Sequence, residues 1–356
     1  RVSATLTGSG QGFSATATEA QGILAVQDAQ YGPHRLSSLT ARTTLSDGQA
    51  RTEASATLNG SRWTLSARGQ PFADVPSVAL TEARFRALDI GPFLGDTTQS
   101  SALRGTLSGQ LRGTAPAALR ATLRLTLDDS RLNRQRISGA TLDATVRDST
   151  VRSTLALSTP EGGMDLALTA RPFGPTPTYR LSEGTFENLD VGALAGLPGL
   201  STGVSGTLRL TGRGTQGPSL RLDAGLALKA STINQAEVSK GRLSVAAADG
   251  RLRADGQVEG AGGTMQFRGR LDSLNTQPAY SFRGRAASVD VSALAGLDSI
   301  PTDLQAVRWS VDGQGTTLGA ATASARLSAT SVRAGPLRLD TVAVAGRLDR
   351  GLFRAD

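Results

Sequence analysis

The sequence predicts an all-β protein of antiparallel strands, elongated and built on an internal repeat of about 100 residues. Apolar and polar residues alternate with period two over most of the chain, which is typical of strands that present one apolar face. Turn-forming dipeptides separate these alternating segments, and their positions recur at a fixed spacing. Segments with the 3.6-residue periodicity of helices are short, so we expect at most about 10% helix.

One short segment recurs three times and marks the repeat. Residues 186–197 read Phe-Glu-Asn-Leu-Asp-Val-Gly-Ala-Leu-Ala-Gly-Leu, and similar segments occupy residues 85–94 and 286–297. Their aspartates, Asp89, Asp190 and Asp290, lie 101 and then 100 residues apart. Each copy ends a strand-like run with an aspartate that is suited to capping a helix N-terminus. We therefore expect short helices near residues 89–95, 190–197 and 290–297.

Other parts of the sequence keep the same period. Hairpin-type dipeptides at residues 47–48, 148–149, 249–250 and 350–351 are each 101 residues apart. The repeat divides the chain into residues 1–88, 89–189, 190–289 and 290–356, of which the first and last are partial copies. Both ends of the sequence read as strand, which predicts an internal segment of a longer protein.

Within a repeat, leucines alternate with arginine and threonine. Leu123, Leu125 and Leu127 fall on one face of a predicted strand, while Arg120 and Arg124 fall on the other. A strand and turn of roughly 10–13 residues gives about seven or eight strands per repeat. The apolar face must be covered, and no long helix is available to cover it. The strands therefore form a closed barrel, a packed sandwich or an open groove.

Composition argues against most catalytic sites. The chain has 356 residues, no Cys and a single His, His34, which excludes disulfides, thiolate metal sites and most histidine-based catalysis. Residues 212–217 match GxGxxG and residues 199–203 match GxSxG, but a strand pattern rather than a helix follows each. We predict no enzymatic activity, no metal and no cofactor.

The net charge of +8 does not by itself indicate a nucleic-acid-binding protein. Lys229 and Lys240 are the only lysines among 38 basic residues, and the arginines stand singly at alternating positions. Runs of arginine with interleaved aromatic residues are missing, and aromatics make up only 4% of the chain. We interpret most arginines as a solvated strand face and predict no nucleic-acid partner.

The repeated Leu-Asp-Val-x-Ala-Leu unit precedes a Leu-x-Gly-x-Leu strand and long alternating strands with Asp-Gly turns. This pattern resembles the AsmA-like and TamB-like (DUF490-type) proteins of the bacterial envelope. The resemblance implies a periplasmic β-groove, or β-taco, that carries phospholipids between the inner and outer membranes of a diderm bacterium. It also implies an N-terminal inner-membrane anchor and, in some members, an Omp85-type outer-membrane partner; this sequence shows neither the anchor nor a recognisable C-terminal domain for docking the partner.

The resemblance leads to one main functional hypothesis and two alternatives. The main hypothesis is a non-enzymatic conduit whose apolar groove shields acyl chains. The alternatives are an assembly or secretion factor for outer-membrane proteins and a structural surface protein built of β-repeats. In the conduit, the predicted groove lining consists of Leu103, Leu107, Leu123, Leu125, Leu127, Leu208, Leu210, Leu222, Leu226 and Leu228.

Overall fold

The computed structural model describes residues 3–12, 18–32, 34–95, 99–197, 199–215, 219–234, 236–260, 263–272, 278–290, 302–315, 321–334, 337–349 and 352–355. These residues form an antiparallel β structure with two four-residue helices, which confirms the all-β prediction. Neither helix is long and apolar enough to cross a membrane. The chain divides into two compact units, of which the first comprises residues 1–174 and 192–198 and the second residues 175–191 and 199–356.

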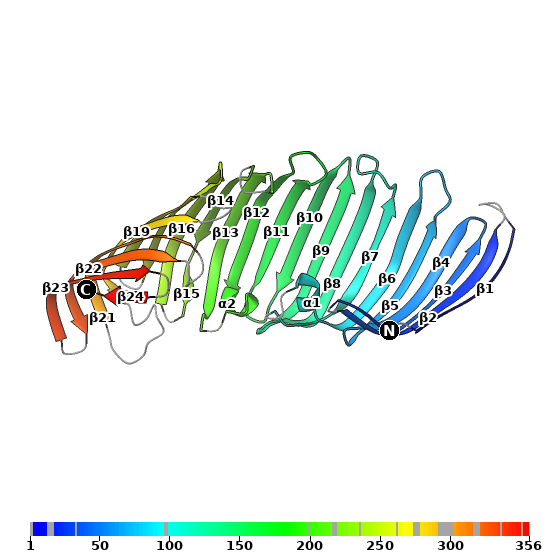
Figure 1. Cartoon of the computed structure of the whole chain (residues 1–356), viewed down its shortest axis with the longest axis horizontal. Helices are drawn as coiled ribbons and strands as arrows, with labels where there is room; N and C mark the ends of the chain where they lie inside the picture. The colour runs from blue at the N-terminus through cyan, green and yellow to red at the C-terminus, as the bar shows by residue number, and fades with distance from the viewer. Residues whose placement is uncertain are drawn as a thin grey trace. The chain divides into compact units, whose positions relative to one another are not determined.

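In the first unit, each strand lies beside its neighbours in the sequence (Figure 1). All the described pairings are antiparallel, and the sheet runs in chain order from β1 to β11. The strands are β1 Ser3–Gln11, β2 Glu19–Tyr31, β3 His34–Ser46, β4 Gln49–Leu58, β5 Ser61–Gln70, β6 Ser77–Leu88, β7 Ser101–Arg112, β8 Arg120–Leu132, β9 Gln135–Arg147, β10 Thr150–Ser158 and β11 Gly163–Arg171.

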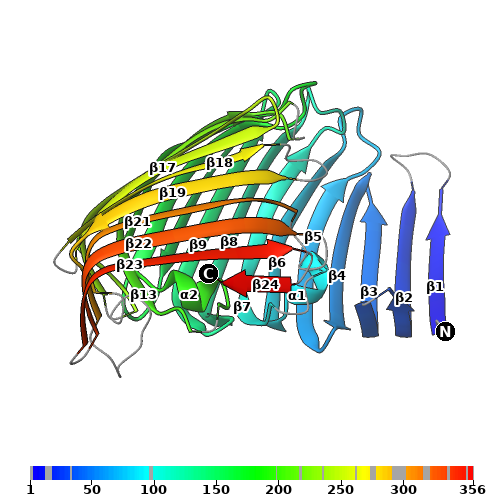
Figure 2. The same ribbon diagram turned by 60° about the vertical axis from the view of Figure 1, so that its left-hand side comes forward.

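The second unit repeats this arrangement, and Figure 2 shows its strands β17, β18, β19, β21, β22 and β23 side by side. Two strand positions are interrupted. Strands β14 and β15 both pair with β13 and β16, and strands β19 and β20 both pair with β21. The strands are β12 Thr178–Leu189, β13 Thr202–Arg213, β14 Arg221–Leu228, β15 Ser231–Ile233, β16 Ala236–Ala248, β17 Arg251–Gly260, β18 Gly263–Asp272, β19 Ala279–Ala287, β20 Val289–Asp290, β21 Thr302–Gln314, β22 Thr322–Ala334, β23 Leu337–Asp349 and β24 Leu352–Ala355.

The predicted hairpin turns are confirmed where the structure describes them. Asp47 and Gly48 have φ angles of 50° and 70°, and Asp249 and Gly250 have 53° and 72°. Two successive positive φ values define a type I′ turn, whose twist matches that of the flanking strands. The same conformation at Asp148 shows that aspartate enters this region even where no glycine follows. The fourth predicted turn, at residues 350–351, lies outside the described residues.

The period of 101 residues also appears in the backbone. Asp28 and Asp129 each have a positive φ within a long strand, and Ser331 has one 202 residues after Asp129. Such residues produce bulges that bend a strand without ending it. The strands are therefore longer than predicted, reaching 13 residues in β8 and β9. The expectation of seven or eight strands per period is wrong, because six strand positions separate Asp89 from Asp190.

The two helices are α1, Gly91–Leu94, and α2, Val191–Leu194, at the predicted positions. The third expected helix lies outside the described residues, apart from Asp290. Asp89 does not act as the predicted N-cap of α1, because Ile90 occupies that position without a side-chain hydrogen bond. The Asp89 carboxylate instead accepts hydrogen bonds from the backbone N–H groups of Gly91 and Ser101, both at 3.1 Å. It therefore ties the start of the helix to the start of β7.

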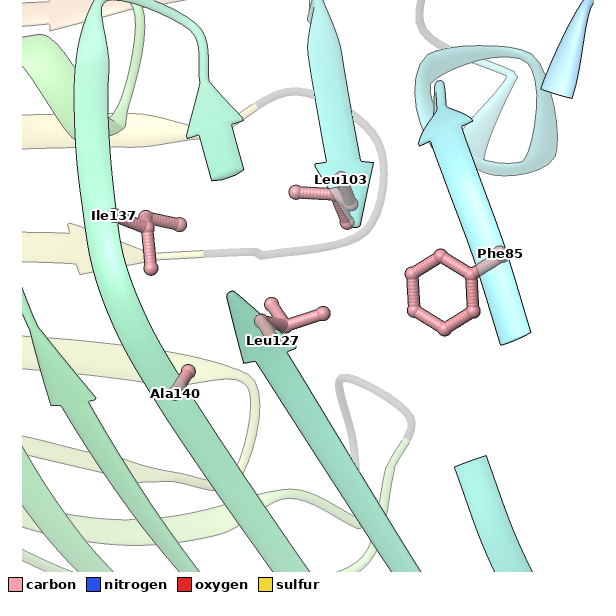
Figure 3. Packing of buried hydrophobic residues seen from close by; sticks show 5 residues of the cluster. All are labelled: Phe85, Leu103, Leu127, Ile137 and Ala140. Carbon is pink, nitrogen blue, oxygen red and sulfur yellow. The ribbon is translucent and has the colours of Figure 1, made fainter. Parts of the chain in front are cut away.

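A small buried cluster lies on the apolar face of the first unit, near the β6 end that leads into α1 (Figure 3). Trp63 packs against Phe85 with ring centroids 5.2 Å apart, and Ile90, which precedes α1, also contacts the cluster. Burying each large apolar side chain stabilises the fold by about 1.5–3 kcal/mol. The buried members are Phe85, Leu103, Leu127, Ile137 and Ala140.

Candidate functional site: an uncharged apolar face

The register of the first unit aligns aliphatic side chains in one row across all eleven described strands. Strand neighbours are about 4.8 Å apart, so the row extends on the order of 48 Å along the sheet. Every position in it is leucine or alanine. The row consists of Leu6, Leu24, Ala41, Ala54, Leu65, Ala83, Leu107, Leu125, Leu142, Leu155 and Leu166.

The flanking rows on this face also lack charge. They begin on β1 at Ala4, Gly8 and Gly10, and none of the positions paired with these across the eleven strands is Asp, Glu, Lys or Arg. Alternation is therefore maintained in every strand, and the bulges do not rotate a charged residue onto the apolar face. The result is an uncharged, mainly apolar surface four rows wide, in which Thr43, Thr52 and Ser153 are the hydroxyl-bearing positions.

The second unit has a corresponding uncharged row. It crosses nine strand positions and contains leucine, valine, glycine and aromatic residues. Its members are Leu208, Leu226, Leu243, Gly256, Phe267, Gly284, Trp309, Leu327 and Val344.

Aromatic rings in this unit lie directly over glycines of neighbouring strands. A Cβ atom added to Gly256 would collide with the ring of Phe267, and one added to Gly284 would collide with the indole of Trp309. Phe282 covers Gly269 in the same way. A ring packed over a strand glycine compensates for the missing side chain and permits curvature at that point. Sequence alternation alone did not reveal these pairs, because the partners become neighbours only through the register.

All ten predicted lining leucines lie in β7, β8, β13 or β14, on the apolar face, but their exposure differs. Leu103 and Leu127 are buried in the cluster of Figure 3, so they form core rather than accessible lining. Leu123 is 39% exposed. The others, which are Leu107, Leu125, Leu208, Leu210, Leu222, Leu226 and Leu228, are half-buried. The structure thus brings these leucines onto apolar faces, while their role as a lipid-binding groove stays a prediction.

The opposite face carries the charges. Arg120, Arg124 and Arg221 are exposed there, as predicted. The Arg124 guanidinium binds the Asp143 carboxylate across β8 and β9, with Nε 2.6 Å from Oδ1. This hydrogen bond lowers the pKa of Asp143 below its ordinary value of 3.8 and raises the pKa of Arg124. Both side chains are solvated, so the pair adds little stability.

The described residues offer no constellation of catalytic groups. The His34 ring packs against the Phe93 ring, with ring centroids 4.9 Å apart. Its Nδ1 lies 3.3 Å from the side-chain amide nitrogen of Asn59. The GxSxG segment leads into β13 rather than into a helix, and β14 begins at Arg221, four residues after the GxGxxG segment. No group of three His, Cys, Asp or Glu residues in the described ranges is arranged to hold a metal ion.

Comparisons with protein-family models, curated proteins and solved structures find no match to this chain. The resemblance to AsmA-like and TamB-like proteins therefore rests on the residues quoted for it. The surface chemistry of the two apolar faces is the remaining basis for inferring a function.

Proposed function

We propose that the apolar faces bind the acyl chains of phospholipids and that the protein acts as a non-enzymatic lipid conduit. The observation that supports this most directly is the uncharged row from Leu6 to Leu166. Each buried methylene contributes about 0.8 kcal/mol, so a lipid tail gains from every position along such a row. The row has little chemical variety, which suits ligands that share acyl chains and differ in their headgroups.

The exposure of the lining supports a binding surface rather than a closed core. Side chains in a packed interior are nearly all buried, whereas Leu123 is 39% exposed and Leu226 is half-buried. An accessible apolar surface of this extent is typical of interaction sites. In this proposal the protein bridges the inner and outer membranes through the periplasm, with an inner-membrane anchor and an Omp85-type partner in the full-length protein.

Site-specific photo-crosslinking tests which face meets lipid. A crosslinker at Leu226 should capture phospholipid, and one at Arg221 on the opposite face of the same strand should not. Mass spectrometry of the adducts distinguishes phospholipid from polypeptide. Equal capture at both positions would contradict the assignment of faces, and polypeptide adducts at Leu226 would support the assembly-factor alternative.

A charge placed in the row tests transport. Leu226→Asp should lower the free energy of unfolding by only about 1 kcal/mol, because a half-buried carboxylate keeps part of its water. Lipid transfer between vesicles by the full-length protein should nevertheless fall, since acyl chains would meet a hydrated charge. Thr207→Asp is the matched control, because Thr207 is exposed on the polar face of the adjacent strand. A folded Leu226→Asp variant with normal transfer would defeat the conduit proposal.

A further inference from the structure

The polar face of the second unit contains a depression of about 1520 Å³ that spans strands β14 to β21. Seven basic and four acidic side chains line it, so basic side chains outnumber acidic ones by three. The basic residues are Lys240, Arg242, Arg268, Arg270, Arg283, Arg285 and Arg308, and the acidic residues are Asp255, Asp272, Asp312 and Glu259.

Each of the four carboxylates already has a basic partner. Three of these ion pairs are 2.9–3.0 Å long and the fourth is 4.0 Å long. The pairs are Lys240 with Glu259, Arg268 with Asp255, Arg270 with Asp272, and Arg283 with Asp312. The net positive charge of the depression therefore resides on Arg242, Arg285 and Arg308.

These three arginines lie in one row of the sheet. The register places Arg242, Gln257, Gln266, Arg285 and Arg308 at directly opposed positions on five successive strand positions. Arg285 donates from Nε and Nη2 to the Gln266 side-chain oxygen at 3.1 and 2.7 Å. Among the described residues, neither an ion pair nor a side-chain hydrogen bond joins Arg242 or Arg308 to another residue. The row therefore carries hydrogen-bond donors but contains no carboxylate that could neutralise the arginines.

Arg285 and Arg308 face each other directly across β19 and β21, and like charges at such positions are destabilising. Two arginines at directly opposed strand positions can share one phosphate group, each donating two N–H groups to its oxygens; Arg285 keeps its Nη1 hydrogens and one Nη2 hydrogen for this, because Gln266 accepts only from Nε and Nη2. We propose that Arg285 and Arg308 form a binding site for phosphate esters, with Arg242 and the two glutamines available to further polar groups of the ligand.

The surroundings favour a phosphorylated headgroup or metabolite over single-stranded nucleic acid. Phe267 and Trp309 lie in the apolar row, on the opposite face from the arginines, so neither of these two rings is placed to stack on a base held by the arginines. The site also lies on the opposite face from the proposed acyl-chain surface and is independent of it. A phosphate on a lipid headgroup and a phosphate on a soluble molecule would present the same oxygens to Arg285 and Arg308.

Binding of inorganic pyrophosphate to the whole chain at low ionic strength tests the site, measured by isothermal titration calorimetry. Arg285→Gln/Arg308→Gln should weaken binding at least tenfold. The control is Arg51→Gln/Arg68→Gln, which removes a directly opposed arginine pair from the first unit, and its affinity should stay within twofold. Arg308→Lys keeps the charge but loses the fork, so its affinity should fall between those of the wild type and the double variant.

Vesicles identify the source of the phosphate. Co-sedimentation with phosphatidic acid vesicles but not phosphatidylcholine vesicles, abolished by pyrophosphate, would support the site and assign it to lipid headgroups. Pyrophosphate binding without vesicle binding would support a soluble ligand. Absence of pyrophosphate binding, or equal loss in both double variants with unchanged circular dichroism, would overturn the proposal.

Discussion

In the first unit the central apolar row is made of leucine and alanine, whereas in the second unit glycines alternate with aromatic rings over part of the row. The buried clusters differ in the opposite sense, with the larger side chains in the first unit. The first contains Phe85, Leu127 and Ile137, whereas the second contains Ala286, Val307 and Ala329. An uncharged face can therefore be built in two ways. We expect stability to depend on a few buried side chains in the first unit and to be spread over many partly exposed rings in the second.

The largest difference should come from removing one ring from each unit. Phe85→Ala takes a 4%-exposed side chain out of the first cluster and should cost about 3–5 kcal/mol. Phe267→Ala removes a half-buried ring and should cost about half as much. Urea denaturation combined with hydrogen exchange of the strands in each unit measures both values. Equal losses of unfolding free energy in the two variants would contradict the expected difference between the units.

Methyl groups added to one glycine in each unit test the same difference in packing. In Gly105→Ala the new Cβ would overlap the backbone oxygen of Thr126, which cannot move without disturbing the β7–β8 pairing. We expect a loss of about 2–3 kcal/mol. In Gly256→Ala the Cβ meets the Phe267 ring, which can rotate away, so the loss should be about 1 kcal/mol. Thermal unfolding of the two variants provides the ranking, and the reverse order would show that the rings are held rigidly.

Asn133 and Asn234 lie 101 residues apart, at corresponding positions of the repeat, and their side-chain hydrogen bonds hold strand ends together. The buried Asn133 donates from Nδ2 to the carbonyl of Leu194 at 2.7 Å and accepts from the N–H of Ser100 at 2.9 Å. Asn133→Ala should cost about 1–3 kcal/mol because it leaves these groups unpaired. Asn234→Ala should cost less, since Asn234 is only half-buried. Both have positive φ, so the matching Asn→Gly variants separate backbone strain from lost hydrogen bonds.

The smallest effect concerns pH. The Arg124 hydrogen bond lowers the pKa of Asp143 in the folded chain below 3.8, so the pair stabilises the fold above that pH. This stabilisation is lost as the pH falls through the lowered pKa, when the carboxylate becomes protonated. NMR titration of Asp143 in the wild type and in Arg124→Gln should show an upward shift of its pKa in the variant. An unchanged titration would mean that the pair does not persist in solution.

The sequence was informative about local structure and uninformative about register. Alternation identified the faces of Leu125 and Arg124, and the Asp47-Gly48 dipeptide identified a hairpin, because both signals are local. The number of strands was misjudged because residues such as Asp129 bend a strand without ending it. The arginine row was not foreseen because Arg285 and Arg308 become neighbours only through the pairing of β19 with β21. The sequence singles out Asp89 correctly but not its position, because Ile90 occupies the N-cap and the Asp89 carboxylate joins the start of the helix to the start of β7.

The sequential pairing of the strands has a consequence for how the chain acquires its structure. Within each unit, every described pairing joins strands that are adjacent in the chain or separated by a single strand, so closing the loops costs little entropy. A chain emerging N-terminus first can add each strand to an edge that already exists, without waiting for a distant segment. The bond from Asn133 to Leu194 joins residues 61 positions apart and forms only after the segments of β9, β10, β11 and β12 have been made. This hydrogen bond would therefore form late and would hold α2 against the turn between β8 and β9.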